Sequence, residues 1–286
     1  MTTICRLIIF CWLGPSVASG VSLSLPASRD NTLYEDSLGG FSNGAGEYMF
    51  VGKTVQGSIR RAVPAGAVVR SASVRLHVSK TISGSVPTAL HCLTSNWGEG
   101  TSNAGSRGGG GTFAQTNDAT WLHTFYSAQF WTNPGGDFLE DPSAQQNLGA
   151  EGFYVWGPTP ELAADVTHWH NAPGANFGWI LISDEIDSPS AKRLDTRTHL
   201  DSARRPVLLL EVDVPLRILG TTVVSNHLSF SFSALANQSY VIEQRATLVA
   251  GFWSALTNIA AAPALRTITI RRPLTTSRQF HRVVAP

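Results

Sequence analysis

Apolar and polar residues alternate with a period of two along much of the chain. In residues 74–78 valine and leucine alternate with Arg75 and His77, and in residues 228–233 leucine and phenylalanine alternate with serine. This alternation predicts strands with one buried face. Residues 177–182 and 207–212 are continuous apolar runs, short enough to be central strands of a sandwich. The pattern predicts an all-β fold.

One segment has a helical period instead. Residues 159–170 place Pro160 in the first turn, where its fixed φ suits a helix. Leu162, Ala163, Val166 and Trp169 would then lie on one face of three turns. We expect a single short helix here.

Long stretches rich in Gly, Ser, Thr and Asn connect the predicted elements. They cover residues 39–46, 98–112 and 133–137. Loops of this length on a β scaffold are where ligands are usually bound. Residues 108–111 are four glycines without the lysine and helix of a phosphate-binding loop, so we interpret them as a flexible loop.

The charges divide the chain into two parts. Residues 215–286 hold seven arginines and one glutamate, a net charge of +6, whereas residues 21–214 hold 13 basic and 19 acidic side chains, a net charge of −6. With 286 residues in all, two domains are expected. We predict domains at 21–214 and 215–286, and five strands in the second at residues 228–233, 239–245, 253–256, 267–272 and 279–284.

Residues 1–20 have the composition of a secretory signal peptide. Arg6 precedes an apolar run over residues 7–13, and small residues follow up to Gly20. The run is too short to span a bilayer, and no later stretch is long enough. The mature protein is therefore expected to be secreted or held at the cell surface, with no transmembrane segment. Cys92 is the one cysteine left after residue 20, and we interpret it as a small buried hydrophobe on a strand.

A series of short blocks resembles a known family. The blocks are DNTLYED (30–36), SNGAGEYMFVGKT (42–54), GSIRRA (57–62), NWGEGTSNAG (96–105), DATWLHTFY (118–126), WTNPGGDF (131–138), DVTHWHNAPGANFGWILI (165–182), AKRLDTR (191–197) and RRPVLLLEV (204–212). Together they are similar to exported bacterial proteins with the DNRLRE domain, a jelly roll similar to family 96 carbohydrate-binding modules. SFSALANQSYVIEQRATLVAGFW and QFHRVV, in residues 215–286, resemble a small fibronectin-like β-sandwich. The resemblance implies a jelly-roll β-sandwich followed by a second, smaller one.

One departure from that family concerns a strand. Members have a strand between the segment like GSIRRA and the following turn, but here Val63 runs directly into Pro64. The missing strand would leave backbone groups of its neighbours without partners. Either a neighbouring segment replaces it or the fold is only marginally stable.

Three groups of residues are candidates for a metal or catalytic site, but the pattern of each favours an ordinary structural role. His168 and His170 are two residues apart in the predicted helix, so their side chains diverge. Asp137, Glu140 and Asp141 suit an exposed acidic loop. Asp30 and Asn31 would hold a structural calcium ion only by analogy with lectin-like jelly rolls. We expect no catalytic residue, no required cofactor and no nucleic-acid partner.

Aromatic and cationic residues in the loops are the candidates for binding. Sugars present C–H faces that stack on aromatic rings, and their hydroxyl or carboxylate groups accept hydrogen bonds from arginine. The predicted ligand-binding residues are Lys53, Arg60, Arg61, Trp97, Tyr126 and Trp131.

The favoured function is non-catalytic binding of an extracellular polysaccharide or cell-envelope glycan. A cell-surface adhesion or matrix structural protein is the alternative, and an accessory chain of a polysaccharide hydrolase or lyase is a more distant one. A hydrolase would need two carboxylates facing one cleft, roughly 5 to 10 Å apart.

Overall fold

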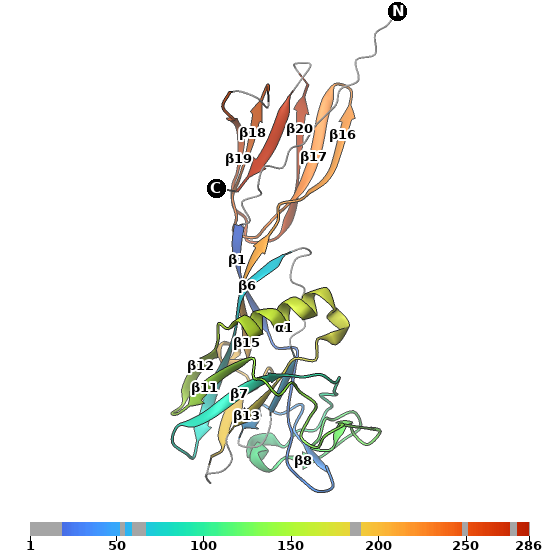
Figure 1. The fold of residues 1–286 in the computed structure, drawn as a ribbon, viewed down its shortest axis with the longest axis vertical. Coiled ribbons are helices and arrows are strands. Elements are labelled where there is room, and N and C mark those ends of the chain that lie inside the picture. Colours follow the sequence, from blue (N-terminus) through green and yellow to red (C-terminus); the bar gives the residue numbers. More distant parts are fainter. Residues whose placement is uncertain are drawn as a thin grey trace, which may run out of the picture. The chain divides into compact units, whose positions relative to one another are not determined.

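The computed structural model describes residues 19–51, 55–58, 67–183, 190–247, 251–274 and 279–285. Strands account for 48% of the structure and helix for 9%, so the predicted all-β fold is confirmed (Figure 1). The predicted signal peptide, apart from Ser19 and Gly20, lies outside the described residues, and so does the segment around Val63 where a strand was expected to be missing.

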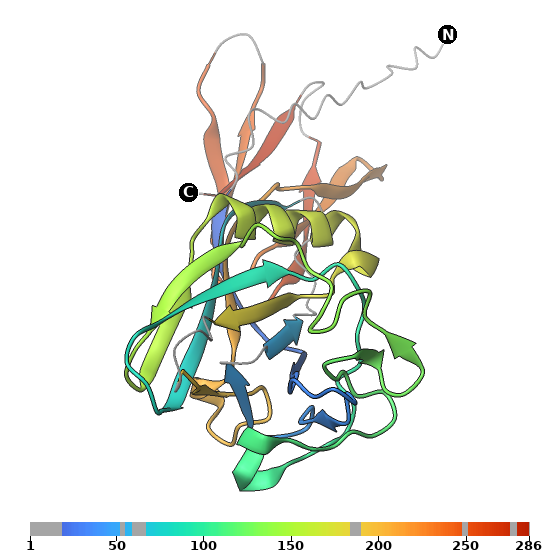
Figure 2. The same cartoon turned by 60° about the horizontal axis from the view of Figure 1, so that its bottom comes forward.

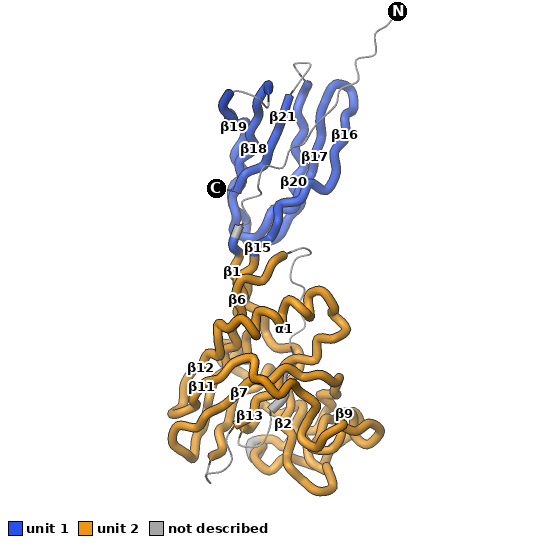
Figure 3. The backbone as a smooth tube through the Cα atoms, viewed as in Figure 1, with its two compact units in different colours: residues 1–20, 213–286 blue, residues 21–212 orange. Residues whose placement is uncertain are grey.

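The chain forms two compact units (Figure 3). One covers Val21–Val212, and the other covers Asp213–Pro286 together with Met1–Gly20. The division falls between Val212 and Asp213, close to the boundary expected after residue 214 from the change in charge.

The larger unit is a sandwich of two sheets. In the first sheet the strand order is β1-β15-β6-β14-β4, and β12 also pairs with β6; in the second it is β11-β7-β13-β5-β2. The strands of the first sheet are β1 (Ser19–Pro26), β15 (Val207–Val214), β6 (Val68–Thr81), β14 (Lys192–Asp195), β4 (Tyr48–Val51) and β12 (Gly152–Trp156). Those of the second are β11 (Ala144–Leu148), β7 (Val86–Cys92), β13 (Trp179–Ser183), β5 (Val55–Ser58) and β2 (Arg29–Thr32).

Strand β6 shows why the apolar alternation gives this sandwich. Val74, Leu76 and Val78 are buried between the sheets, and Arg75 and His77 point to the outer face. The hairpin of β11 and β12 then joins the two layers, because β11 pairs with β7 and β12 pairs with β6. Cys92 ends β7 and is buried, as predicted. Burial and the nearby charge of Asp165 raise the pKa of its thiol to about 12, so the thiolate is strongly disfavoured.

Helix α1 (Pro160–Asn171) confirms the predicted helix. The Thr159 hydroxyl caps it by accepting a hydrogen bond from the Leu162 N–H, and Pro160 occupies the first turn. Leu162, Val166 and Trp169 are buried on one face, as the spacing predicted, whereas Ala163, predicted with them, is only partly buried. The Trp169 ring packs edge-on against Trp179 of β13 at 4.4 Å, which fixes the helix to the second sheet.

The connections of the larger unit pack as closely as its sheets. They carry the short strands β3 (Phe41–Ser42), β8 (Thr112–Phe113), β9 (His123–Phe125) and β10 (Gln129–Phe130) and the 3-10 helices η1 (Gly105–Gly110), η2 (Pro173–Ala175) and η3 (Ser202–Arg204). Figure 2 shows the loops that hold β8 and η1 gathered at one end of this unit. A separate core cluster lies there, formed by Leu33, Leu93, Trp97, Ala119, Trp131 and Ile180.

Gly108 to Gly110 lie in η1 and Gly111 is its C-cap, so the four-glycine run has regular structure where an irregular loop was expected. Gly108 and Gly109 lie against the ring of Phe50, and a Cβ at Gly108 would be 3.0 Å from Phe50 Cε2. Gly111 has a φ of +68°, and a Cβ there would be 2.8 Å from the ring of Tyr34. Glycine is needed because the backbone passes directly over two aromatic rings.

The smaller unit has two three-stranded sheets. Their orders are β16-β17-β20 and β19-β18-β21. The strands are β16 (Ile218–Val224), β17 (His227–Ala234), β18 (Tyr240–Arg245), β19 (Ser254–Ile259), β20 (Arg266–Pro273) and β21 (Phe280–Val284). Five of the six were predicted, and β16 was missed. A core of Leu228, Phe230, Phe232, Ala234, Tyr240 and Ile242 lies between the sheets.

Candidate functional site

A row of polar and aromatic side chains crosses four strands on the outer face of the first sheet. Phe153 of β12 lies opposite His77 of β6, and Asp195 of β14 lies opposite Tyr48 of β4. The two pairs are joined because His77 Nδ1 lies 2.7 Å from Asp195 Oδ2. Residues opposite each other in antiparallel strands share a face, so these four side chains form a continuous line. We call this row, together with Arg75 and Arg193, the outer-face row.

Two arginines lie on the aromatic rings of this row. The Arg75 guanidinium is 5.2 Å from the centre of the Phe153 ring, and that of Arg193 is 3.9 Å from the centre of the Tyr48 ring. Arg193 also donates hydrogen bonds to Ser79, from Nε to Oγ at 3.0 Å and from Nη2 to the carbonyl oxygen at 3.3 Å. Neither arginine forms an ion pair with a carboxylate of the described residues. Both cations thus rest on aromatic rings, Arg193 is held by Ser79 as well, and neither has a counter-charge within the part of the chain that the structure describes.

Asp195 anchors the middle of the row. Its carboxylate is buried and is contacted by two imidazoles, His77 at 2.7 Å and His199 Nε2 at 3.7 Å. His199 Nδ1 accepts the Asp201 N–H at 3.1 Å, which leaves Nε2 to face the carboxylate. The His199 ring also packs edge-on against Tyr48 at 5.8 Å. Asp195 therefore orients rings and is itself closed off from solvent.

The side chains of the row differ in how far they are exposed to solvent. Phe153 is 51% exposed, and Arg75, Arg193 and Tyr48 are partly exposed, whereas the His77 side chain is mostly covered. The edge of the His77 ring meets Phe153 at 4.7 Å. The surface available to a ligand therefore consists of two aromatic rings and two guanidinium groups.

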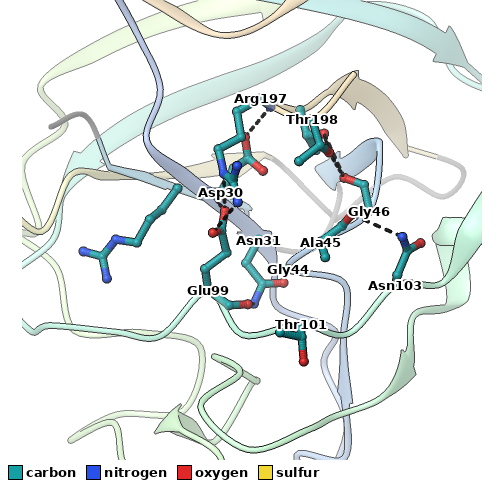
Figure 4. Close-up of polar contacts among 12 residues, drawn as sticks. Asp30, Asn31, Gly44, Ala45, Gly46, Glu99, Thr101, Asn103, Arg197 and Thr198 are labelled. Carbon is teal, nitrogen blue, oxygen red and sulfur yellow. Dashed lines mark hydrogen bonds and ion pairs between the residues drawn. The ribbon is translucent and has the colours of Figure 1, made fainter. Parts of the chain in front are cut away.

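At the loop end of the same unit, Asn31 forms a buried hydrogen-bond centre (Figure 4). Its Nδ2 donates to the hydroxyl of Ser42 and to the carbonyl oxygens of Glu99 and Ala119. Its Oδ1 accepts the N–H groups of Thr32 and Asn43 and the Ser42 hydroxyl. One side chain thereby ties three loops to β2, and its amide is occupied by protein groups.

Asp30, beside Asn31, belongs to an acidic pair neutralised by arginine (Figure 4). Glu99 makes two contacts of 2.5 Å with the Arg197 guanidinium, and its Oε1 accepts the Asp30 N–H at 2.9 Å. Asp30 Oδ2 accepts the Arg197 N–H at 2.6 Å. Burial, reinforced by the charge of Glu99 and opposed by Arg197, raises the pKa of Asp30 to about 7. Arg197 supplies the positive charge here, so this arrangement does not fit the calcium ion suggested by analogy.

Two predicted ligand-binding residues prove to be core residues. Trp97 is 0% exposed and Trp131 is also buried, both in the loop-end core cluster. Their indole N–H groups donate to the carbonyl oxygens of Phe177 at 2.8 Å and Thr120 at 2.9 Å. Neither ring has a face open for sugar stacking, so this part of the predicted site is wrong. The polar loop sequence around each tryptophan hid the fact that the loops close over a core of their own.

Tyr126 lies at the hairpin between β9 and β10 and is partly exposed. Its ring meets His123 edge-on at 5.0 Å, and His123 lies 4.4 Å from the exposed ring of Phe130. Burial lowers the pKa of His123, which keeps the imidazole neutral between these rings. The hairpin offers a small aromatic surface without an arginine among these contacts. The remaining predicted ligands, Lys53, Arg60 and Arg61, lie outside the described residues.

The three other candidate groups have structural surroundings. Asp137 is buried, and although burial opposes it, hydrogen bonds from Thr132, Ser95 and Asn133 lower its pKa. Glu140 and Asp141 are exposed. His168 and His170 lie in the last turn of α1. Within the described residues, no group of three or more His, Cys, Asp or Glu is arranged to hold a metal ion.

Sequence reasoning found the strand of Arg75 and His77 but not the row that they form. The signal for β12 was the apolar and aromatic run GFYVW, and AKRLDTR contains Arg193 and Asp195. What was missing was the strand order, which places these two segments on either side of β6.

Comparisons with known proteins add no relative. No family model matches the chain, and no curated protein matches it. The resemblance to DNRLRE domains and family 96 carbohydrate-binding modules therefore stays a prediction. In the part of the chain that the structure describes, no helix is long and apolar enough to cross a bilayer.

Proposed function

We propose that the protein is an exported, non-catalytic carbohydrate-binding protein whose larger unit binds an acidic polysaccharide on the outer-face row. One observation carries the proposal: two partly exposed aromatic rings each hold an arginine that has no carboxylate partner among the described residues. The expected signal peptide supports export. The ligand would be an extracellular or cell-envelope polymer that carries carboxylate or sulfate groups.

The chemistry of such a polymer matches both kinds of group in the row. A sugar ring places its C–H face on Phe153, as sugars do on aromatic side chains. A carboxylate on the same or the next sugar accepts a forked hydrogen bond from Arg75 or Arg193. The row crosses four strands, about 14 Å at the usual spacing of 4.7 to 4.9 Å, so it can contact more than one sugar.

The carboxylates of this unit support binding rather than hydrolysis. Asp30 and Glu99 lie together, but Arg197 holds both and Asp30 is buried. Asp195 is covered by two imidazoles. Glycoside hydrolysis needs one carboxyl group as acid and a second facing the same sugar, and these three side chains are engaged within the protein.

Affinity electrophoresis against acidic and neutral polysaccharides tests the proposal. We expect retardation on an acidic polymer that weakens as salt is added, because the contacts are ionic. Arg75→Gln with Arg193→Gln should lower affinity roughly ten- to a hundredfold, since one charged hydrogen bond contributes about 1.5 to 3 kcal/mol. Arg266→Gln with Arg271→Gln, on exposed positions of β20, removes the same charge from the other unit and should change affinity little.

A matched aromatic pair tests the stacking half of the site. Phe153→Ala should weaken binding severalfold or more, whereas Phe113→Ala, which removes a ring that is 78% exposed elsewhere in the same unit, should not. Phe130→Ala examines the β9–β10 hairpin as the competing surface. Retention of full binding by the double arginine variant and by Phe153→Ala, both with native circular dichroism, would contradict the proposed site. Loss of binding only with Phe130→Ala would move the site to the hairpin.

A further inference from the structure

Strand β16 is an uncovered edge of the smaller unit. It stands at one end of the order β16-β17-β20, and none of the described strands pairs with its other side. Its sequence, ILGTTVV, contains no charged residue and no proline, and every residue from Leu219 to Val224 is exposed. Figure 1 shows it as the outermost strand of its sheet. Such an edge presents unpaired backbone N–H and C=O groups that can pair with another strand.

Two of the other three edges of this unit carry charges or a proline that hinder pairing. The opposite edge of the same sheet, β20, has three arginines and ends in Pro273. In the second sheet β21 carries His281 and Arg282, and the uncharged edge β19 is partly buried and contains Asn258. Charges and prolines at an edge oppose the addition of a strand. β16, like β19, has no charge and no proline, and it is the most exposed of the four edges; its one irregularity is a register shift between Ile218 and Gly220 in the pairing with β17.

The side chains of β16 are apolar on both faces of the sheet. Val223 lies opposite the core residue Leu228, on the core face, yet it is 45% exposed. Val224 lies opposite His227 on the outer face and is 65% exposed, and Leu219 is 56% exposed. Apolar side chains therefore remain exposed on both faces at this edge of the sheet. A further strand paired there would cover them.

The pattern of apolar and polar residues in β16 is symmetric about Thr221. Two apolar residues stand at each end, and Gly220, Thr221 and Thr222 stand in the middle. When two copies pair antiparallel about Thr221, Thr221 lies opposite its own equivalent and Leu219 lies across from Val223, beside the register shift between Ile218 and Gly220. A two-fold axis requires such a self-complementary patch, and the absence of charge removes repulsion between the copies.

We propose that two copies of this protein associate through antiparallel pairing of their β16 strands, which joins their three-stranded sheets into one. The inference is independent of the proposed carbohydrate site, because the pairing surface lies in the smaller unit. A dimer of this kind also presents two outer-face rows to one polymer, which raises apparent affinity if both can bind together.

Sedimentation velocity of the exported full-length protein over a concentration series tests the pairing. Val223→Lys with Val224→Lys places two charges at the edge and should weaken dimer formation at least tenfold. Thr267→Lys with Thr269→Lys adds the same charge at exposed positions of β20 and should leave the dimer unchanged. A monomer at all concentrations, or equal weakening by both variants, would overturn the proposal.

Salt distinguishes this dimer from association between the oppositely charged parts of two chains. Pairing by backbone hydrogen bonds and apolar contact should persist at high salt, whereas attraction between the −6 and +6 segments would be screened. A dimer that dissociates on adding salt would therefore contradict the β16 interface.

Cross-linking tests the pairing directly. Paired residues have Cα atoms about 4.5 to 5.5 Å apart, within the range that a disulfide spans. Thr221→Cys should give a covalent dimer on oxidation, and Thr269→Cys on β20 should not. Cys92 is buried, which limits interference. Failure of Thr221→Cys to cross-link in a preparation that sediments as a dimer would place the interface elsewhere.

Discussion

The loop end and the outer face of the larger unit use similar side chains for different purposes. At the loop end, tryptophans, asparagine, carboxylates and an arginine contact one another: Asn31 is buried, and the partly exposed Arg197 is paired with Glu99 (Figure 4). On the outer face, Arg75 and Arg193 rest on aromatic rings and have no carboxylate partner among the described residues. Residue types common in binding sites therefore indicate a site only where their charge has no counter-charge among the described residues, which holds for Arg75 and for Arg193 even though Arg193 donates hydrogen bonds to Ser79.

The comparison also explains why the loop end needs so many polar contacts. Loops without regular pairing must satisfy their backbone groups in other ways. Asp118 accepts the N–H groups of Thr101, Ser102 and Gln115, and Asn31 accepts two more. The strands of the outer face satisfy their backbones by pairing, so their side chains are released for other contacts.

The largest expected effect concerns Trp97. Trp97→Ala should lower the free energy of unfolding by about 3 to 5 kcal/mol, because it empties the loop-end core cluster and leaves the Phe177 carbonyl without its donor. Urea unfolding followed by fluorescence measures it. A stability within about 0.5 kcal/mol of the wild type would mean that the loops do not close over a core.

The next effect concerns the buried amide of Asn31. Asn31→Ala should cost about 3 kcal/mol, since several buried donors and acceptors lose their partner. Asn133→Ala, at an exposed position, serves as the control and should change stability by less than about 0.5 kcal/mol. Equal loss in both variants would remove the special role given to Asn31.

A pH effect should follow from Asp30. Its pKa is raised to about 7 in the folded protein from 3.8, so its contribution to stability is complete below about pH 4 and is lost as the pH rises through 7. Between pH 5 and pH 8 this amounts to about 2 to 3 kcal/mol. Asp30→Asn should reduce the difference between urea midpoints at these two pH values. An unchanged difference would assign the pH dependence to other groups.

The smallest expected effect concerns the exposed ring of Phe153. Phe153→Ala should change the free energy of unfolding by about 0.5 kcal/mol or less, because half of the side chain is already exposed. The same variant should weaken polysaccharide binding. A large loss of stability instead would make Phe153 a structural residue like Trp97, and the contrast between the two regions would fail.

The regular elements could be predicted from the sequence, because the periodicity that marks each one lies within a short segment. The alternation around Arg75 and His77 gave β6, and the spacing of Leu162, Val166 and Trp169 gave α1, which begins at Pro160, one residue after the predicted start. The change in charge placed the predicted domain boundary close to the division between Val212 and Asp213. β16 was missed because two of its seven residues are threonines and one is glycine, and none of them alternates with the apolar positions.

Which side chains are exposed and which are buried could be seen only in the tertiary structure. Trp97 and Phe153 are both aromatic residues beside polar sequence, yet one lies in a core and the other on a surface. The difference arises from contacts between distant segments: Trp97 meets Phe177, which lies 80 residues away, and His77 meets Asp195, which lies 118 residues away. Local periodicity contains no information about such pairs, because strand order and loop closure are set by packing of the whole sandwich.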